Sequence, residues 1–112
     1  MRAFYAFLIA IAVLWAVLRN ARAQLYVSSR PEGGLFGVVS EYNATTGEVI
    51  RANLITGLSV PRALAVSGNK LFVANTVSGT VSEYDATTGE VIKANFITGL
   101  SNPEGIAVKS AK

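Results

Sequence analysis

The 112-residue chain contains no cysteine and no histidine. Without cysteine no disulfide can form, although small exported domains usually depend on disulfides for their stability. Without histidine, a Ser-His-Asp triad, a Cys-His pair and a histidine metal site are all excluded within one chain. Glu41 and Glu83 stand at equivalent positions of a repeat, as do Glu48 and Glu90, so they are expected to be structural copies and not a differentiated acid–base pair. We therefore predict no catalytic residue, no metal ligand and no cofactor.

The chain also lacks a basic surface once its first residues are set aside. The net charge of +3 and the pI of about 9.5 come from Arg2, Arg19 and Arg22, because residues 24–112 carry seven basic and seven acidic side chains. A basic excess would favour a nucleic-acid partner. Since no basic stripe remains, the sequence predicts no nucleic-acid binding.

One long apolar run is present, at the N-terminus. It extends from Ala3 to Leu18, is followed by the small-x-small triplet 21–23, and is typical of a secretory signal peptide cleaved between Ala23 and Gln24. As a helix the run would span about 24 Å, less than the roughly 30 Å hydrocarbon core of a bilayer. We expect residues 1–23 to form a signal helix. The protein is then secreted, periplasmic or on the cell surface, with membrane contact solely through an uncleaved signal segment.

Two stretches of the remaining chain are nearly identical. Residues 39–50 read VSEYNATTGEVI and residues 81–92 read VSEYDATTGEVI, and the match continues through Pro61 and Pro103 at a constant offset of 42 residues. A period of this length is typical of stacked supersecondary units that bury their apolar faces against one another.

Each repeat is predicted to contain four short strands. In the second copy these are 70–74, 80–84, an outer half-buried strand at 91–96 and a small-residue inner strand at 105–108. Residues 85–89 predict a type I hairpin turn with a bulge, in which Asp85 is the side-chain acceptor and Gly89 adopts a left-handed conformation. Four strands per repeat at this period indicate a β-propeller blade. The predicted fold is all-β: two four-stranded antiparallel blades of a partial propeller over residues 24–112.

Several segments of the repeat resemble a known class of sequences. The NHL and YVTN types of β-propeller repeat are resembled by four segments: 71–75, Ser78-Gly79-Thr80-Val81, Tyr84-Asp85-x-x-Thr88-Gly89 and Pro103-x-Gly105-Ile106-Ala107-Val108. The resemblance covers residues 24–112 and implies the propeller fold. It implies no single activity, because such repeats occur in interaction scaffolds, surface proteins and some enzymes.

The blade number departs from that class, whose propellers usually carry about six or seven blades in one chain. Residues 25–27 match 71–73, so the strand at 105–108 would complete a blade that 25–27 begin. Two interpretations remain open. Several copies assemble head to tail, as a trimer or tetramer that completes a ring, or the sequence is a truncated fragment of a larger propeller protein without independent function.

Binding residues are predicted on loops, where the two repeats differ most. Val60, Arg62 and Ala63 are replaced by Asn102, Glu104 and Gly105, and the loop at 30–34 is four residues longer than its counterpart. Because loops on a rigid scaffold commonly carry binding residues, the candidates for contact with an unknown protein or carbohydrate ligand are Arg30, Glu32, Arg62, Asn75, Asn102 and Glu104. An alternative implied by the resemblance is a ring-forming lactonase-like hydrolase with a channel metal, although no metal motif supports it.

Overall fold

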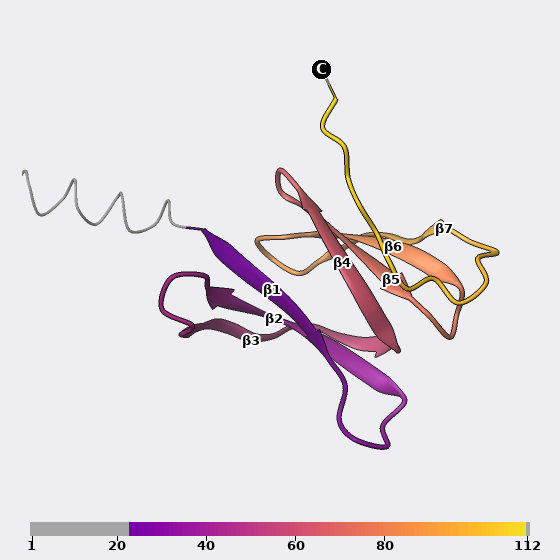
Figure 1. The fold of residues 1–112 in the computed structure, drawn as a ribbon, viewed down its shortest axis with the longest axis horizontal. Coiled ribbons are helices and arrows are strands. Elements are labelled where there is room, and N and C mark those ends of the chain that lie inside the picture. Colours follow the sequence, from indigo (N-terminus) through magenta and orange to yellow (C-terminus); the bar gives the residue numbers. More distant parts are fainter. Residues whose placement is uncertain (1–22, 112) are drawn as a thin grey trace, which may run out of the picture.

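The computed structural model describes residues 23–111, and these residues are all-β. The predicted signal peptide, except for Ala23, lies outside the described residues. The strands are β1 (Gln24–Ser29), β2 (Phe36–Asn43), β3 (Val49–Ser59), β4 (Pro61–Ser67), β5 (Lys70–Asn75), β6 (Thr80–Asp85) and β7 (Val91–Ile97). They form two antiparallel sheets, sheet A in the order β1-β2-β3 and sheet B in the order β4-β5-β6-β7 (Figure 1). Within residues 23–111, no helix is long and apolar enough to cross a membrane.

The hairpin turns form as the sequence predicts. The Asp85 side chain accepts hydrogen bonds from the backbone N–H groups of Thr87 and Thr88 at 2.8 and 2.9 Å, and Gly89 follows at φ 77°. Asn43 makes the same two contacts in the first repeat, with Gly47 at φ 77°. An Asx acceptor fixes the turn, and glycine supplies the left-handed residue without a steric cost.

The hydrophobic core lies between the two sheets. Successive side chains of a strand point to opposite faces, so alternate residues of β5 face sheet A. The buried cluster consists of Val39, Ile55 and Leu58 from sheet A and Leu71, Val73 and Ala86 from sheet B and its following turn. Each repeat therefore covers the apolar face of the other, as the stacking argument predicts.

Polar contacts also join the sheets. The Tyr26 hydroxyl, on β1, donates to the backbone carbonyl of Ala86 at 3.0 Å, and the Arg51 guanidinium, on β3, donates to that of Thr87. Both acceptors lie in the turn between β6 and β7. This turn of sheet B is consequently held against two strands of sheet A.

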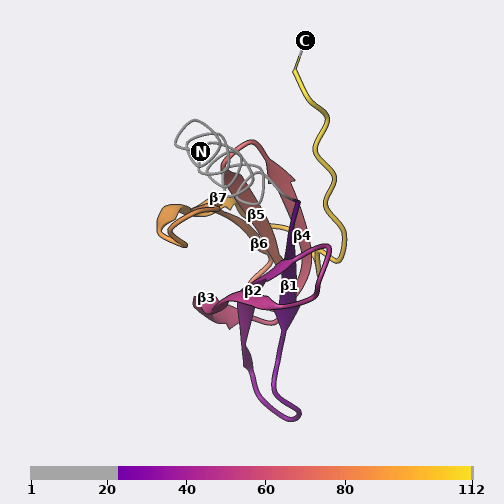
Figure 2. The same ribbon diagram turned by 90° about the vertical axis from the view of Figure 1, so that its left-hand side faces the viewer.

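The structure departs from the prediction at the C-terminal segment. Sheet A has three strands, not four, and residues 103–111, here called the tail segment, belong to no strand, so the predicted strand at 105–108 is absent. The physical reason is the lack of a pairing partner: the counterpart strand β4 pairs with β5, whereas the tail segment pairs with no strand of the described chain. Figure 1 shows it leaving the loop after β7, crossing over sheet B and ending beyond the sheets, and Figure 2 shows its extended course from the side. Its start is fixed by a 2.8 Å hydrogen bond from the Thr76 hydroxyl to the Pro103 carbonyl.

The outer strand of sheet B is more open than predicted. β7 is exposed at every residue, including Ile92 and Phe96. Its counterpart β3 has Leu54 half-buried and Ile55 buried, because sheet B covers that face of sheet A. Ile50 and Ala52, which share the predicted apolar face of β3 with Leu54, are exposed. The prediction of a half-buried outer strand thus holds only for Leu54 in β3 and is wrong for β7.

Candidate functional site

Four loops lie at one end of the strands. In an antiparallel arrangement the ends of β1, β3, β5 and β7 point the same way, so the connections at 30–35, Val60, 76–79 and 98–102 share one side (Figure 1). We call this side the loop end. Arg30, Glu32 and Asn102, predicted from the sequence, lie in these connections. Asn75 is the last residue of β5 and Arg62 the second residue of β4, whereas Glu104 lies in the tail segment.

The loop between β1 and β2 is folded back on itself. Gly34 N–H donates to the Pro31 carbonyl at 2.9 Å, and the Arg30 guanidinium donates to the Gly34 carbonyl at 3.0 Å. Gly33, between them, has φ 76°, which favours glycine. Glu32 is exposed at the outside of this turn. The loop therefore presents an acidic side chain on a locally fixed backbone.

Arg62 and Glu104 are brought together by the fold. They occupy equivalent positions of the two repeats, and the Arg62 guanidinium lies 3.2 Å from the Glu104 carboxylate. Both side chains are at least half exposed, so the pair contributes less than about 1 kcal/mol to stability. Asn102, nearby and exposed, has φ 49°, as does its counterpart Val60.

Asn75 differs from the other candidates because it is buried. Its side-chain amide donates to the hydroxyls of Ser82 at 3.0 Å and Thr80 at 3.3 Å, while its side-chain oxygen has no partner in the described part of the chain. The Ser82 hydroxyl in turn donates to the Ala94 carbonyl on β7. Asn75 thus ties β5 to β6 beneath the loop end and offers little surface to a ligand.

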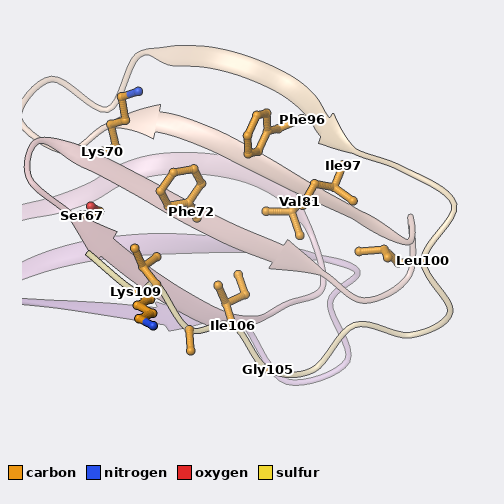
Figure 3. Close-up of a pocket in the computed structure, with 12 residues that line it drawn as sticks. Ser67, Lys70, Phe72, Val81, Phe96, Ile97, Leu100, Gly105, Ile106 and Lys109 are labelled. Atoms are coloured by element: carbon orange, nitrogen blue, oxygen red, sulfur yellow. The ribbon is translucent and has the colours of Figure 1, made fainter. Parts of the chain in front are cut away.

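A groove beside sheet B contains residues that sequence reasoning did not select. It has a volume of about 680 Å³ and lies between the outer face of sheet B and the tail segment. The Phe72 and Phe96 rings pack there with centroids 5.8 Å apart, and Ile106 points from the tail segment toward Phe72 and Val81 (Figure 3). The repeat could have indicated these groove residues, because Val81 and Phe96 correspond to Val39, which is in the core, and to Leu54, which packs against it.

Two titratable side chains have environments that shift their pKa. Hydrogen bonds from the backbone N–H groups of Thr88 and Thr87 lower the pKa of Asp85 below its ordinary 3.8. Burial, followed by the charge of Glu41, raises the pKa of Tyr26 above its ordinary 10.0. Both groups lie at the turn end or sheet interface and not at the loop end. In residues 23–111, no group of three His, Cys, Asp or Glu side chains is placed to hold a metal ion.

The described residues therefore form an all-β protein, in which two copies of one sequence repeat build two antiparallel sheets. Comparison with protein-family models, with curated proteins and with solved structures finds no match.

Proposed function

We propose that this protein is an exported β-propeller repeat module that binds a protein or carbohydrate ligand through its loop end and has no catalytic activity of its own. Sheet B supports the assignment as a blade, since four short antiparallel strands follow one another in sequence order. Sheet A supplies three strands of a second blade. The N-terminal signal pattern supports export.

The observation that carries the binding role is the convergence of loops from both sheets on one side. Arg30, Glu32, Arg62, Asn102 and Glu104 are exposed there on a framework fixed by strand pairing and by the core between the sheets. The turns at the other end are near-copies of one another, whereas the loop end is where the repeats differ. Variable polar loops on a rigid support are the usual arrangement of a binding surface.

The test is to probe the purified protein against a glycan array and a phage-displayed peptide library, then to compare two variants. The loop-end variant combines Glu32→Ala with Asn102→Gly, because neither side chain makes a hydrogen bond within the described chain, and glycine accepts the left-handed backbone of Asn102. The control is Thr45→Ala, an exposed change in the turn between β2 and β3.

A ligand of the loop end should lose at least about tenfold in affinity with the loop-end variant, the equivalent of about 1.4 kcal/mol, and bind the control normally. Failure to retain any ligand would contradict the proposal, as would a ligand that is insensitive to the loop-end variant but sensitive to Thr45→Ala.

A further inference from the structure

Sheet A lacks the strand that β4 supplies to sheet B. β4 pairs with β5 along one edge of sheet B, whereas the corresponding edge of β1 has no partner strand within residues 23–111. One repeat length after β4 comes the tail segment, which is unpaired. The described chain thus contains an unpaired edge of β1. It also contains the unpaired tail segment, which corresponds in the repeat to β4, the strand that pairs with the equivalent edge of β5.

The free edge and the free segment lie apart in one chain. The tail segment borders the groove with Phe72 and Val81, which point away from sheet A, while Leu71 and Val73 on the same strand point into the core between the sheets. Sheet B therefore stands between the tail segment and the free edge of β1. The Arg62–Glu104 ion pair holds the start of the tail segment beside the start of β4, the strand that corresponds to it in the first repeat.

We propose that a second copy of this chain is the partner: the tail segment of one copy pairs antiparallel with β1 of the next, and the outer face of sheet B packs against the outer face of sheet A. Both outer faces are counterparts of the core faces that already pack together inside the chain. This inference depends on the equivalence of the two repeats and not on ligand binding at the loop end.

The outer face of sheet A carries the same apolar residues as the face of sheet B that packs in the core. Leu25 and Val27 correspond to Leu71 and Val73. The first two are 49% and 39% exposed, whereas the second two are completely buried. The same apolar residue types thus stand uncovered at the positions that the repeat buries.

The outer face of sheet B reproduces the sheet A side. Ile97 and Leu100 correspond to Ile55 and Leu58, and they are 44% and 39% exposed where their counterparts are each 4% exposed. Phe96, the counterpart of Leu54, widens this apolar surface at the groove (Figure 3). Two exposed apolar faces that match an existing interface fit each other, so the predicted contact is head to tail.

The two residues of one polar contact across the internal interface have counterparts of similar chemistry in the other repeat. Arg51 donates to the carbonyl of Thr87 across the internal interface. The counterparts of these residues are Lys93 and Thr45. Lysine is likewise a cationic donor, so Lys93 of one copy is suited to donate to the Thr45 carbonyl of the next.

The internal pairing fixes the register between copies. β4 pairs with β5 so that Ala63 stands opposite Ala74 and Leu64 opposite Val73. Shifting both strands to their counterparts places Gly105 of one copy opposite Ser28 of the next. Ile106 then stands opposite Val27, where both side chains point to the same face of the new sheet.

Cross-linking tests this register directly, because the chain has no cysteine of its own. Ser28→Cys and Gly105→Cys are made as separate full-length chains, one of them carrying a size tag, and mixed under mild oxidation. Gly105 has open space around it, so a side chain is accommodated there. The matched control replaces Gly105→Cys by Ile106→Cys, whose side chain points to the opposite face of the strand.

A second variant tests the pairing without touching the core. Ile106→Pro with Ala107→Pro removes two successive N–H groups, one of which must point toward β1 because they alternate along a strand. Within residues 23–111 the tail segment makes no strand pairing, so both intramolecular sheets, and with them a β-type circular dichroism spectrum, should be retained. The control is Ser110→Pro with Ala111→Pro, beyond the proposed register.

The proposal expects a mass of several chains by light scattering, a disulfide between Ser28→Cys and Gly105→Cys at least tenfold faster than in the shifted control, and loss of the assembly in the Ile106 and Ala107 double variant alone. A single-chain mass at every concentration would overturn it. An assembly that forms the shifted disulfide equally fast, or that survives the double proline variant, would overturn it as well. None of these readouts involves the loop-end ligand, so the two proposals fail separately.

Discussion

The Tyr26 hydroxyl is one of two side-chain groups, with the Arg51 guanidinium, through which sheet A holds the turn between β6 and β7, and Tyr26→Phe removes only the contacts of this hydroxyl. Its oxygen lies 3.0 Å from the Ala86 carbonyl and 3.4 Å from a carboxylate oxygen of Glu41. The aromatic ring is retained, and Phe72, its counterpart in the second repeat, shows that phenylalanine fits this strand position. We therefore expect lost hydrogen bonding without a cavity.

The expected loss is about 1 kcal/mol of unfolding free energy, within a range of roughly 0.5–1.5 kcal/mol for a hydrogen bond. The 3.4 Å contact with Glu41 is long and adds little, and because Tyr26 is half-buried, water can reach the Ala86 carbonyl after the substitution. For a domain of this size the loss corresponds to a decrease in Tm of about 4–8 °C. Denaturant and thermal unfolding followed by circular dichroism measure it.

Alkaline unfolding provides an independent readout of the same side chain. Because the pKa of Tyr26 is raised in the folded state, its contribution to stability is present below its ordinary pKa of 10.0 and is lost as the pH rises through the folded value. Tyr26→Phe should remove that part of the alkaline loss. The matched control is Tyr84→Phe, since the Tyr84 hydroxyl makes no hydrogen bond in the described part of the chain. Equal stability changes in the two variants would refute the role assigned to Tyr26.

Three further substitutions test the turns and the core. Asp85→Asn should keep the turn, since asparagine occupies the equivalent position in the first repeat. Because the pKa of Asp85 is lowered in the folded state, this carboxylate contributes stability that is present above pH 3.8 and lost at lower pH, and the variant should lose less stability in acid. An acid titration by circular dichroism identical to that of the unmodified protein would contradict this. Gly47→Ala should cost about 1–2 kcal/mol of unfolding free energy, because alanine disfavours the left-handed backbone. Gly89→Ala should cost more, because its added methyl group also collides with the backbone carbonyl of Leu54 on β3. Equal denaturation midpoints of the two variants would show that the turn at Gly89 does not contact β3. Leu71→Ala should cost about 2–5 kcal/mol and Leu25→Ala clearly less in a single chain, as measured by chemical denaturation at low protein concentration; a similar loss in both would mean that Leu25 is buried before any second copy binds.

The sequence predicted the local structure well because its signals are local. The hairpin turns follow from Asn43 and Asp85 as acceptors and from Gly47 and Gly89, whose left-handed conformation is set by neighbouring backbone atoms. Strands β5 and β6 follow from short apolar alternation between polar loops. These features need no information about distant parts of the chain.

The candidate residues lie at or near one end of the strands, but their individual environments differ. Strand direction alone puts the odd-numbered strand ends on one side, so their shared location follows from the predicted topology. The burial of Asn75 does not, because it depends on hydroxyls contributed by β6. The Arg62–Glu104 ion pair likewise requires the tail segment to lie beside β4.

By itself the sequence determined the repeat, the turns and the alternation of apolar residues that makes each sheet two-faced. The tertiary structure decided which copy of each face is covered: Leu71 and Ile55 are buried, whereas the corresponding Leu25 and Ile97 are exposed. It also decided that residues 105–108 form no strand in this chain. The physical reason is the same in both cases. A local pattern specifies what a segment can pair with or pack against, but burial and strand pairing exist only when a second surface is present at the right place.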